Sequence, residues 1–275
     1  MNVVVNVSGE CAKIAAMKNQ TAHDPYRIVP LAAFRDNYIW LLHRGARAAV
    51  VDPGEAAPVL ARLAADGLQL CAILATHHHA DHVGGIAELR ARFPEVPVYG
   101  PVAEAIDGVT VPLRDGDRLE LPFLAAGFDV LAVPGHTRGH LAYYDRNHLD
   151  CGALFCGDTL FSAGCGRLFE GTPRDMQGSL VRLRALPGVT KIYCAHEYTE
   201  ANLRFALAVE PDNAELHAYV AQVAELRAAG RPSLPSTLAQ ERLINPFLRW
   251  DAPAVIAAAA RFRGHPVSGP IEVFA

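Results

Sequence analysis

The feature that most constrains the fold is a pattern that occurs four times in the chain. A short apolar run of strand length ends directly in a segment that carries a histidine or an aspartate; the runs are Ala72–Ala75, Val130–Val133, Ala153–Cys156 and Lys191–Cys194. A strand that runs into polar residues delivers them to the edge of its sheet, where α/β proteins build their sites. One such ending is usually a cap, but four are poorly explained by chance. We therefore expect these strand ends to converge.

Further apolar runs between Arg27 and Glu200 predict more strands: Tyr38–Leu42, Ala48–Val51, Pro97–Tyr99 and Leu141–Tyr144. Helical patterns separate some of them, at Ala56–Ala65, at Gly85–Phe93 and at Pro173–Leu186, which Thr172 can cap. After Glu200 the strand signals stop, and two helical patterns follow, one from a cap at Asp212 to Gly230 and one over Asp251–Arg263. The sequence thus predicts an N-terminal extension (1–26), a mixed α/β domain (27–200) and a smaller helical domain (201–275).

Bulk composition narrows the class of protein. A chain of 275 residues with 51% hydrophobic residues can bury a core without staples. The net charge of -4 argues against a nucleic-acid partner. We see neither a membrane-length apolar run nor a secretory signal, and the six cysteines lack the C-x-x-C spacing. We expect a cytoplasmic protein with reduced thiols that binds neither nucleic acid nor membrane; a monomer is expected, although the sequence does not fix the oligomeric state.

The densest group of chemically active side chains is His77-His78-His79-Ala80-Asp81-His82. Burying so many polar side chains in a core would be costly, whereas imidazoles and carboxylates together suit divalent metals. His77 and His79 point the same way in an extended chain and can hold one ion. Asp81 and His82 lie past the turn and can face a second ion. His78 would point away.

The other three strand endings supply His136, Asp158 and His196, which argues against a simple metal-buffering tract. The whole set resembles the metallo-β-lactamase superfamily, whose H-x-H-x-D-H signature matches residues 77–82. The resemblance implies an αββα sandwich with a smaller C-terminal α-helical domain. It also implies two sets of ligands with one bridge: His77, His79 and His136 for one metal; Asp81, His82 and His196 for the second; Asp158 between them.

Finer motifs are similar to glyoxalase II, the hydroxyacylglutathione hydrolases: Asp36–Trp40, Gly157–Phe161, Gly164–Thr172, His196–Thr199 with Asn202, and Asn245–Arg249. In that family the helical domain covers the metal cleft and helps to hold glutathione. The resemblance implies substrate contacts from Arg167, Phe169 and Tyr198. Alternatively, Arg167 is a surface charge and Tyr198 caps the sheet.

This chain departs from the family pattern in two ways. It has Arg167 and Phe169 where some members carry Lys and Tyr, so the phenol hydroxyl is lost, while the arginine can still bind a carboxylate. It also stops at Val273–Ala275, where members usually continue with a short basic segment that contacts glutathione. A truncated chain, or one without those anchors, is expected to bind substrate more weakly.

Residues beside the predicted ligands receive supporting roles. Asp52 is expected to be a turn residue or to hydrogen-bond a ligand, and Thr76 to hydrogen-bond the ligand run. His140, four residues after His136, is expected to be structural.

The resemblance implies a hydrolase of S-D-lactoylglutathione that releases glutathione and D-lactate, completing methylglyoxal detoxification. Two divalent ions, expected to be zinc although iron or manganese suit the same ligands, would lower the pKa of a shared water and supply hydroxide. Asp158 would bridge the ions, Asp81 would accept the hydroxide proton, and a metal would stabilise the charged carbonyl oxygen. A thiolate leaves with little protonation because its reference pKa is about 8.5.

Two other classes compete with this interpretation. The first is another enzyme of the superfamily, such as a persulfide dioxygenase, a lactonase or a β-lactamase. The dioxygenases use one iron, whereas a second ligand set, Asp81, His82 and His196, is complete here. The second is a metal-binding protein without catalytic activity, which would bind metal and turn over no thioester.

Overall fold

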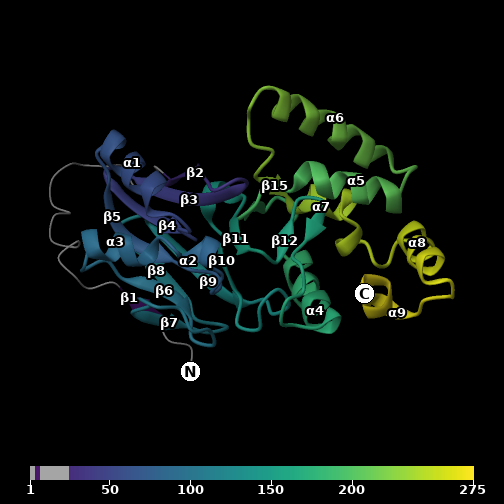
Figure 1. Ribbon diagram of the computed structural model, residues 1–275, viewed down its shortest axis with the longest axis horizontal. Helices are drawn as coiled ribbons and strands as arrows, with labels where there is room; N and C mark the ends of the chain where they lie inside the picture. The colour runs from purple at the N-terminus through teal and green to yellow at the C-terminus, as the bar shows by residue number, and fades with distance from the viewer. Residues whose placement is uncertain (1–3, 7–24) are drawn as a thin grey trace. The chain divides into compact units, whose positions relative to one another are not determined.

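The computed structural model describes residues 4–6 and 25–275 (Figure 1), which fall into two compact units that alternate along the chain. Unit 1 comprises Met1–Ala132 and Leu141–Gly157; unit 2 comprises Val133–His140 and Asp158–Ala275. None of the helices in the described residues combines the length and apolar composition that a membrane crossing requires.

Unit 1 contains a six-stranded sheet whose spatial order follows the chain: β2 (Arg27–Ala33), β3 (Asn37–Arg44), β4 (Arg47–Val51), β5 (Gln69–Leu74), β6 (Val98–Pro101) and β7 (Val111–Leu113). The first three strands pair antiparallel, and β4 to β7 pair parallel. Parallel neighbours need crossover connections. Helix α1 (Ala56–Asp66) connects β4 to β5, and α2 (Ala80–Val83) with α3 (Ile86–Arg92) connects β5 to β6.

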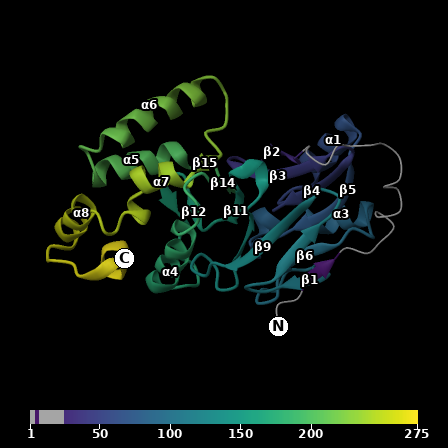
Figure 2. The ribbon, with the colours of Figure 1, turned by 180° about the vertical axis from the view of Figure 1, so that it is seen from behind.

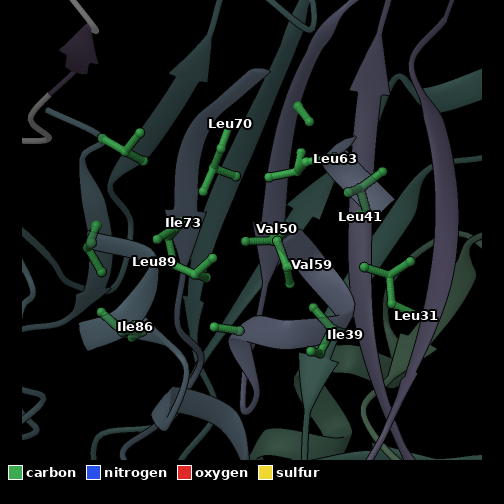
Figure 3. Close-up of a cluster of buried hydrophobic side chains, with 14 of the residues drawn as sticks. Leu31, Ile39, Leu41, Val50, Val59, Leu63, Leu70, Ile73, Ile86 and Leu89 are labelled. Carbon is green, nitrogen blue, oxygen red and sulfur yellow. The ribbon is translucent and has the colours of Figure 1, made fainter. Parts of the chain in front are cut away.

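Helices α1 and α3 cover the same face of this sheet. Alternate residues of a strand point to opposite faces, and Ile39 and Leu41 of β3 enter a buried cluster with Val59 of α1 and Leu89 of α3. Figure 3 shows these side chains facing a shared interior.

The remaining strands of unit 1 are β1 (Val4–Asn6), β8 (Arg118–Leu121), β9 (Ala126–Ala132), β10 (Leu141–Asp145) and β11 (Ala153–Gly157), with the 3₁₀ turn η2 (His148–Asp150) before β11. They lie side by side in chain order; β1 pairs parallel with β8, and the others pair antiparallel. The Tyr143 hydroxyl donates to Ala75 O at 2.7 Å, and Leu141 N donates to Thr76 O at 2.9 Å. These bonds tie β10 to the chain that leaves β5.

Unit 2 begins its second segment with the hairpin β12 (Leu160–Phe161) and β13 (Gly164–Cys165), followed by α4 (Pro173–Arg184) and β14 (Lys191–Cys194). Five helices and two short elements complete it: α5 (Thr199–Val209), α6 (Ala214–Ala228), β15 (Ser236–Thr237), α7 (Leu238–Ile244), η3 (Pro246–Leu248), α8 (Pro253–Arg263) and α9 (Gly269–Phe274). Helices α5 and α6 run side by side (Figures 1 and 2) around Leu203, Leu216 and Val223.

Three sequence-based expectations differ from the structure or lie outside it. Asn213, rather than Asp212, caps α6, because the Asn213 side chain accepts a hydrogen bond from Leu216 N. A strand does follow Glu200: β15 pairs antiparallel with β14, but two residues are too few to show a period. Most of the predicted extension lies outside the described residues, although Val4–Asn6 forms β1.

Candidate metal centre

The histidine-rich segment leaves β5 as extended chain and then turns into α2. His79 has extended backbone angles (φ -63°, ψ 143°) and is the residue before the helix, which begins at Ala80. The ring centroids of His77 and His79 lie 4.7 Å apart, and those of His77 and His82 lie 4.0 Å apart. Three imidazoles of unit 1 are therefore packed against one another rather than spread over a surface.

Asp52, at the end of β4, holds this segment in place. Its carboxylate accepts hydrogen bonds from Thr76 N at 2.7 Å, from Thr76 Oγ1 at 2.8 Å and from His82 Nδ1 at 3.0 Å. Because the single hydroxyl proton of Thr76 goes to Asp52, its oxygen accepts from His77 Nδ1 at 3.0 Å. These bonds favour the tautomer of both histidines with the proton on Nδ1, in which Nε2 would be the atom that binds a metal. The predicted supporting roles of Asp52 and Thr76 are confirmed.

The carboxylate of Asp81 is positioned from β3. Asn37 Nδ2 donates to Asp81 Oδ2 at 3.0 Å, and that oxygen lies 3.6 Å from His82 Nε2. His78 instead bonds Glu104, whose Oε2 accepts from His78 N at 2.6 Å and lies 2.9 Å from His78 Nδ1. The ring of His78 lies 4.9 Å from that of His79, but His78 is not among the described residues grouped closely enough to hold an ion.

In unit 2 a single carboxylate lies between two imidazoles. Asp158 Oδ2 is 3.3 Å from His136 Nε2, and Asp158 Oδ1 is 3.3 Å from His196 Nε2. Two ligands of one tetrahedral ion, each about 2.0–2.1 Å from it, lie about 3.3 Å apart. Each oxygen of Asp158 therefore stands at ligand–ligand distance from a different imidazole. This is the arrangement that a bridging carboxylate requires.

Neighbouring groups fix the orientation of these ligands. His136 Nδ1 donates to Arg167 O at 2.7 Å, because a carbonyl can only accept, so its Nε2 is again the ligand atom. Asp158 N donates to His140 Nε2 at 3.1 Å. His140 is fully buried and holds the backbone of Asp158, so its predicted structural role is confirmed.

The donor set suits a divalent metal. The five histidines and two aspartates predicted as ligands each offer a nitrogen or an oxygen that could hold an ion. Imidazole with carboxylate fits zinc, iron and manganese and excludes none of them. The predicted ligands His77, His82, His136 and His196 are almost fully buried, which isolated polar side chains avoid.

Comparison with known proteins agrees with this geometry. The family described as metallo-beta-lactamase superfamily matches residues 33–196, and the one described as hydroxyacylglutathione hydrolase C-terminus matches residues 197–275. A hydroxyacylglutathione hydrolase of Dechloromonas aromatica is 62% identical over 83% of each chain. One of Nitrosomonas europaea is 51% identical over 90% of this chain and 92% of its own. The chain belongs to the hydroxyacylglutathione hydrolase family.

A solved structure supports the fold of this hydrolase family member. The protein TTHA1623, crystallised in a di-iron-bound form, superimposes with a TM-score of 0.56 at 29% identity, covering 81% of this chain and 100% of its own. Together with the two family matches, this confirms the predicted metallo-β-lactamase fold with a C-terminal helical part. The dinuclear state belongs to that protein; for this chain, the histidine and aspartate groups are consistent with it.

The three residues predicted to contact substrate in this family lie beside the ligands of unit 2. The Arg167 guanidinium stands over the Phe169 ring at 5.4 Å, and that ring meets His136 edge-on at 5.2 Å. Tyr198 stacks on His196 at 4.7 Å with an interplanar angle of 6°. Exposed aromatic and cationic groups next to a metal ligand can bind an anionic, partly apolar ligand. Contact with substrate remains a prediction.

Two residues that hydrogen-bond the histidine-rich segment of unit 1 were not predicted from the sequence. Asn37 belongs to a motif that carried the family resemblance, but its bond to Asp81 spans 44 positions. Glu104, which holds His78, lies 26 positions from it in a segment without regular structure, and no sequence signal marks it.

Proposed function

We propose that this chain hydrolyses the thioester S-D-lactoylglutathione to glutathione and D-lactate, as a step of methylglyoxal detoxification. The observation that carries the proposal is the position of Asp158, whose two oxygens each lie 3.3 Å from the Nε2 of a different histidine. Relatives named hydroxyacylglutathione hydrolase, 62% and 51% identical over most of the chain, support the choice of substrate.

The proposed ligands form two sets joined by one bridge. They are His77, His79 and His136 for the first ion, Asp81, His82 and His196 for the second, and Asp158 for both. Within unit 1, the packed imidazoles and the fixed Asp81 support this assignment. Within unit 2, the Asp158 geometry supports it. Membership of the superfamily supports the joining of the two halves.

When bound, a pair of divalent cations acidifies a water molecule and polarises a carbonyl group. The protein itself positions the metal ligands and the substrate and accepts a proton. Asp81 can take up the proton of the attacking water, because Asn37 orients its carboxylate and its side chain is 41% exposed. Arg167 can bind a carboxylate of glutathione, and Phe169 and Tyr198 offer it apolar surfaces. The departing thiolate needs no separate acid.

We propose zinc as the metal, with iron or manganese as alternatives that suit the same donors. We further propose that the protein acts as a monomer in the cytoplasm, on a small molecule, without a nucleic-acid or membrane partner. The net charge of -4 supports the exclusion of nucleic acid. The proposed division into a domain at 27–200 and a helical domain at 201–275 lies close to the boundary at which the two matched families meet.

The decisive experiment measures steady-state hydrolysis of S-D-lactoylglutathione and the metal content of the same sample. Oxygen uptake with a glutathione persulfide and hydrolysis of a lactone are followed in parallel. Thioester hydrolysis with about two metal ions per chain is expected. Oxygen uptake without thioester hydrolysis would assign the chain to the dioxygenases, and bound metal without any turnover would leave a binding protein.

Asp158→Ala provides the site-specific arm of this test. Removing the shared ligand should lower metal content and hydrolysis together, with kcat/KM reduced by at least about 100-fold, the usual minimum for loss of a principal electrostatic group. Asp117→Ala is the matched control, since Asp117 is a buried carboxylate of unit 1 that accepts from Arg114 N. Full activity with intact metal in the Asp158 variant would contradict the assignment.

A further inference from the structure

A fully buried carboxylate lies outside the proposed ligand set, on helix α7. Glu241 is 0% exposed, and burial raises its pKa. Its Oε1 accepts from Ser162 Oγ at 3.0 Å, and its Oε2 accepts from Ala163 N at 2.8 Å and from Asn245 Nδ2 at 3.0 Å. A buried carboxylate is costly unless hydrogen bonds satisfy it. Two of its partners, Ser162 and Ala163, form the turn of the β12–β13 hairpin. The others are Asn245, at the end of α7, and Ser236 on β15.

Other side chains of unit 2 hold the same turn. Asn245 Nδ2 donates to Phe161 O at 3.1 Å and to Gly164 O at 2.9 Å, and Asn202 Nδ2 donates to Ser162 O at 3.0 Å. Ala163 has a φ of 55°, in the left-handed region that costs a non-glycine residue energy. A strained turn persists only when its surroundings determine it, and Glu241 binds the backbone amide of the strained residue itself.

One end of the hairpin contacts a proposed ligand through its aromatic side chain. The ring of Phe161 meets His196 edge-on at 5.9 Å and Tyr198 at 5.3 Å. Tyr198 in turn stacks on His196. The orientation of the His196 imidazole therefore depends on where the hairpin holds Phe161.

The other end of the hairpin contacts the remaining ligands of unit 2. Two residues after β13, the carbonyl of Arg167 accepts the hydrogen bond that orients His136. Gly166 N donates to Thr159 O at 3.1 Å, and Gly166 lies so close to Asp158 that a Cβ atom would be 1.7 Å from Asp158 O. The hairpin and the two residues that follow it thus contact all three proposed ligands of unit 2.

We propose that Glu241 is a positioning residue for the metal centre: it fixes the β12–β13 turn and, through it, the orientations of His136 and His196 and the place of Asp158. This inference rests on the ligand assignment in the proposed function. It gives the helical C-terminal part of the chain a role in metal binding, since Glu241 and Asn245 both lie in the segment that matches the hydroxyacylglutathione hydrolase C-terminus.

The test compares Glu241→Ala with Glu241→Gln in the full chain, by chelator competition for Co²⁺ and by separate measurement of kcat and KM. In Glu241→Ala we expect metal affinity to fall by about 10- to 100-fold, the range for groups that orient ligands. The fall should appear in kcat, with KM changed by less than about threefold. The Co²⁺ absorption spectrum should also change, because it reports ligand geometry.

Glu241→Gln should restore affinity to within about threefold of the wild type. The amide oxygen can accept from Ala163 N and Asn245 Nδ2, while the amide nitrogen donates to Ser162 Oγ. The matched control is Glu210→Gln. Glu210 is also a buried carboxylate of unit 2, but it pairs with Arg249 at 2.8 and 2.9 Å and not with the hairpin. This control should lower Tm and leave the chelator midpoint unchanged.

A folded Glu241→Ala variant with the wild-type chelator midpoint and Co²⁺ spectrum would overturn the inference. If that variant does not fold, Ser162→Ala removes one hydrogen bond of the same carboxylate, and an unchanged midpoint there would overturn it equally. A wild-type chain that binds metal but hydrolyses no thioester would refute the proposed function. The role of Glu241 would then still be tested by chelator competition and the Co²⁺ spectrum. A wild-type chain that binds no metal would refute both.

Discussion

The Asp52 carboxylate accepts three hydrogen bonds, and two of them come from Thr76, so one side chain controls both the exit of β5 and the ring of His82. Its backbone has a φ of 52°, a conformation that a non-glycine residue adopts at an energetic cost. Strain of this kind is retained where the side chain must reach a particular place. Asp52 therefore sets the tautomer and direction of two proposed ligands without being a ligand itself.

Replacement of Asp52 by alanine should weaken metal binding by about 10- to 100-fold. His82 loses the bond that orients its ring, and Thr76, which orients His77, loses the acceptor that fixes its hydroxyl. Chelator competition measures the effect directly. Glu104→Ala is the matched control, because Glu104 holds His78, which is not a proposed ligand. Equal losses in both variants would show that the whole segment, rather than the Asp52 bonds, determines affinity.

At the scale of single residues, the sequence predicts the candidate metal ligands better than the residues that hydrogen-bond them. The strand endings point to His136, Asp158 and His196 because a buried strand must deliver its next residues to the sheet edge. The assignment of each donor to an ion came from family resemblance. Asn37 could not be derived, since its bond to Asp81 depends on how β3 and the loop after β5 pack.

At the scale of elements, continuous apolar runs predicted several strands, whereas β2, α5 and the two-residue strands β12 and β13 were not predicted. The predicted strands at 48–51 and 191–194 coincide with β4 and β14, because apolar side chains on these strands are buried. The hairpin β12–β13 has two residues in each strand and shows no period. Its conformation depends on Glu241 and Asn245, about 80 residues away.

Two glycines of unit 2 make a paired prediction. A Cβ atom on Gly166 would lie 1.7 Å from Asp158 O, whereas one on Gly178, inside α4, would meet nothing within 4 Å. Gly166→Ala should cost about 1–3 kcal/mol of unfolding free energy through overpacking and should lower metal content. Gly178→Ala should add roughly 0.5–1 kcal/mol, because alanine favours a helix. Denaturant unfolding and metal analysis of both variants check this; an unaffected Gly166 variant would contradict the packing described for Asp158.

At the scale of the whole molecule, the raised pKa values of buried tyrosines should make the free energy of unfolding depend on pH in the alkaline range. Desolvation raises the pKa of Tyr99 from 10.0 to about 12. Below pH 10 the phenol is protonated in folded and unfolded chains alike. Between pH 10 and about 12 the unfolded chain loses the proton and the folded chain keeps it, so the free energy of unfolding falls as pH rises.

Tyr99→Phe should make that alkaline decline shallower and leave stability near neutral pH little changed, as urea unfolding at a series of pH values would show. The decline should not vanish, because burial also raises the pKa values of Tyr143 and Tyr219. A variant whose stability falls as steeply as the wild type above pH 10 would mean that Tyr99 does not remain protonated in the fold.

Metal removal tests the proposal that most concerns the molecule as a whole, namely that ligands of unit 1 and unit 2 share two ions. A ligand that binds only the folded state stabilises it by about 4 kcal/mol when its free concentration is 1,000 times its Kd. A chelator should therefore lower Tm, and added Zn²⁺ should restore it in proportion to the logarithm of the Zn²⁺ concentration.

Because the proposed ligands come from both units, the whole unfolding transition should shift as one. In Asp158→Ala, which lacks the bridge, the response should be much smaller. If the chelator strips the metal and Tm stays constant, or if only part of the unfolding curve shifts, the ions are not shared between the units, and the two ligand sets must act as separate sites.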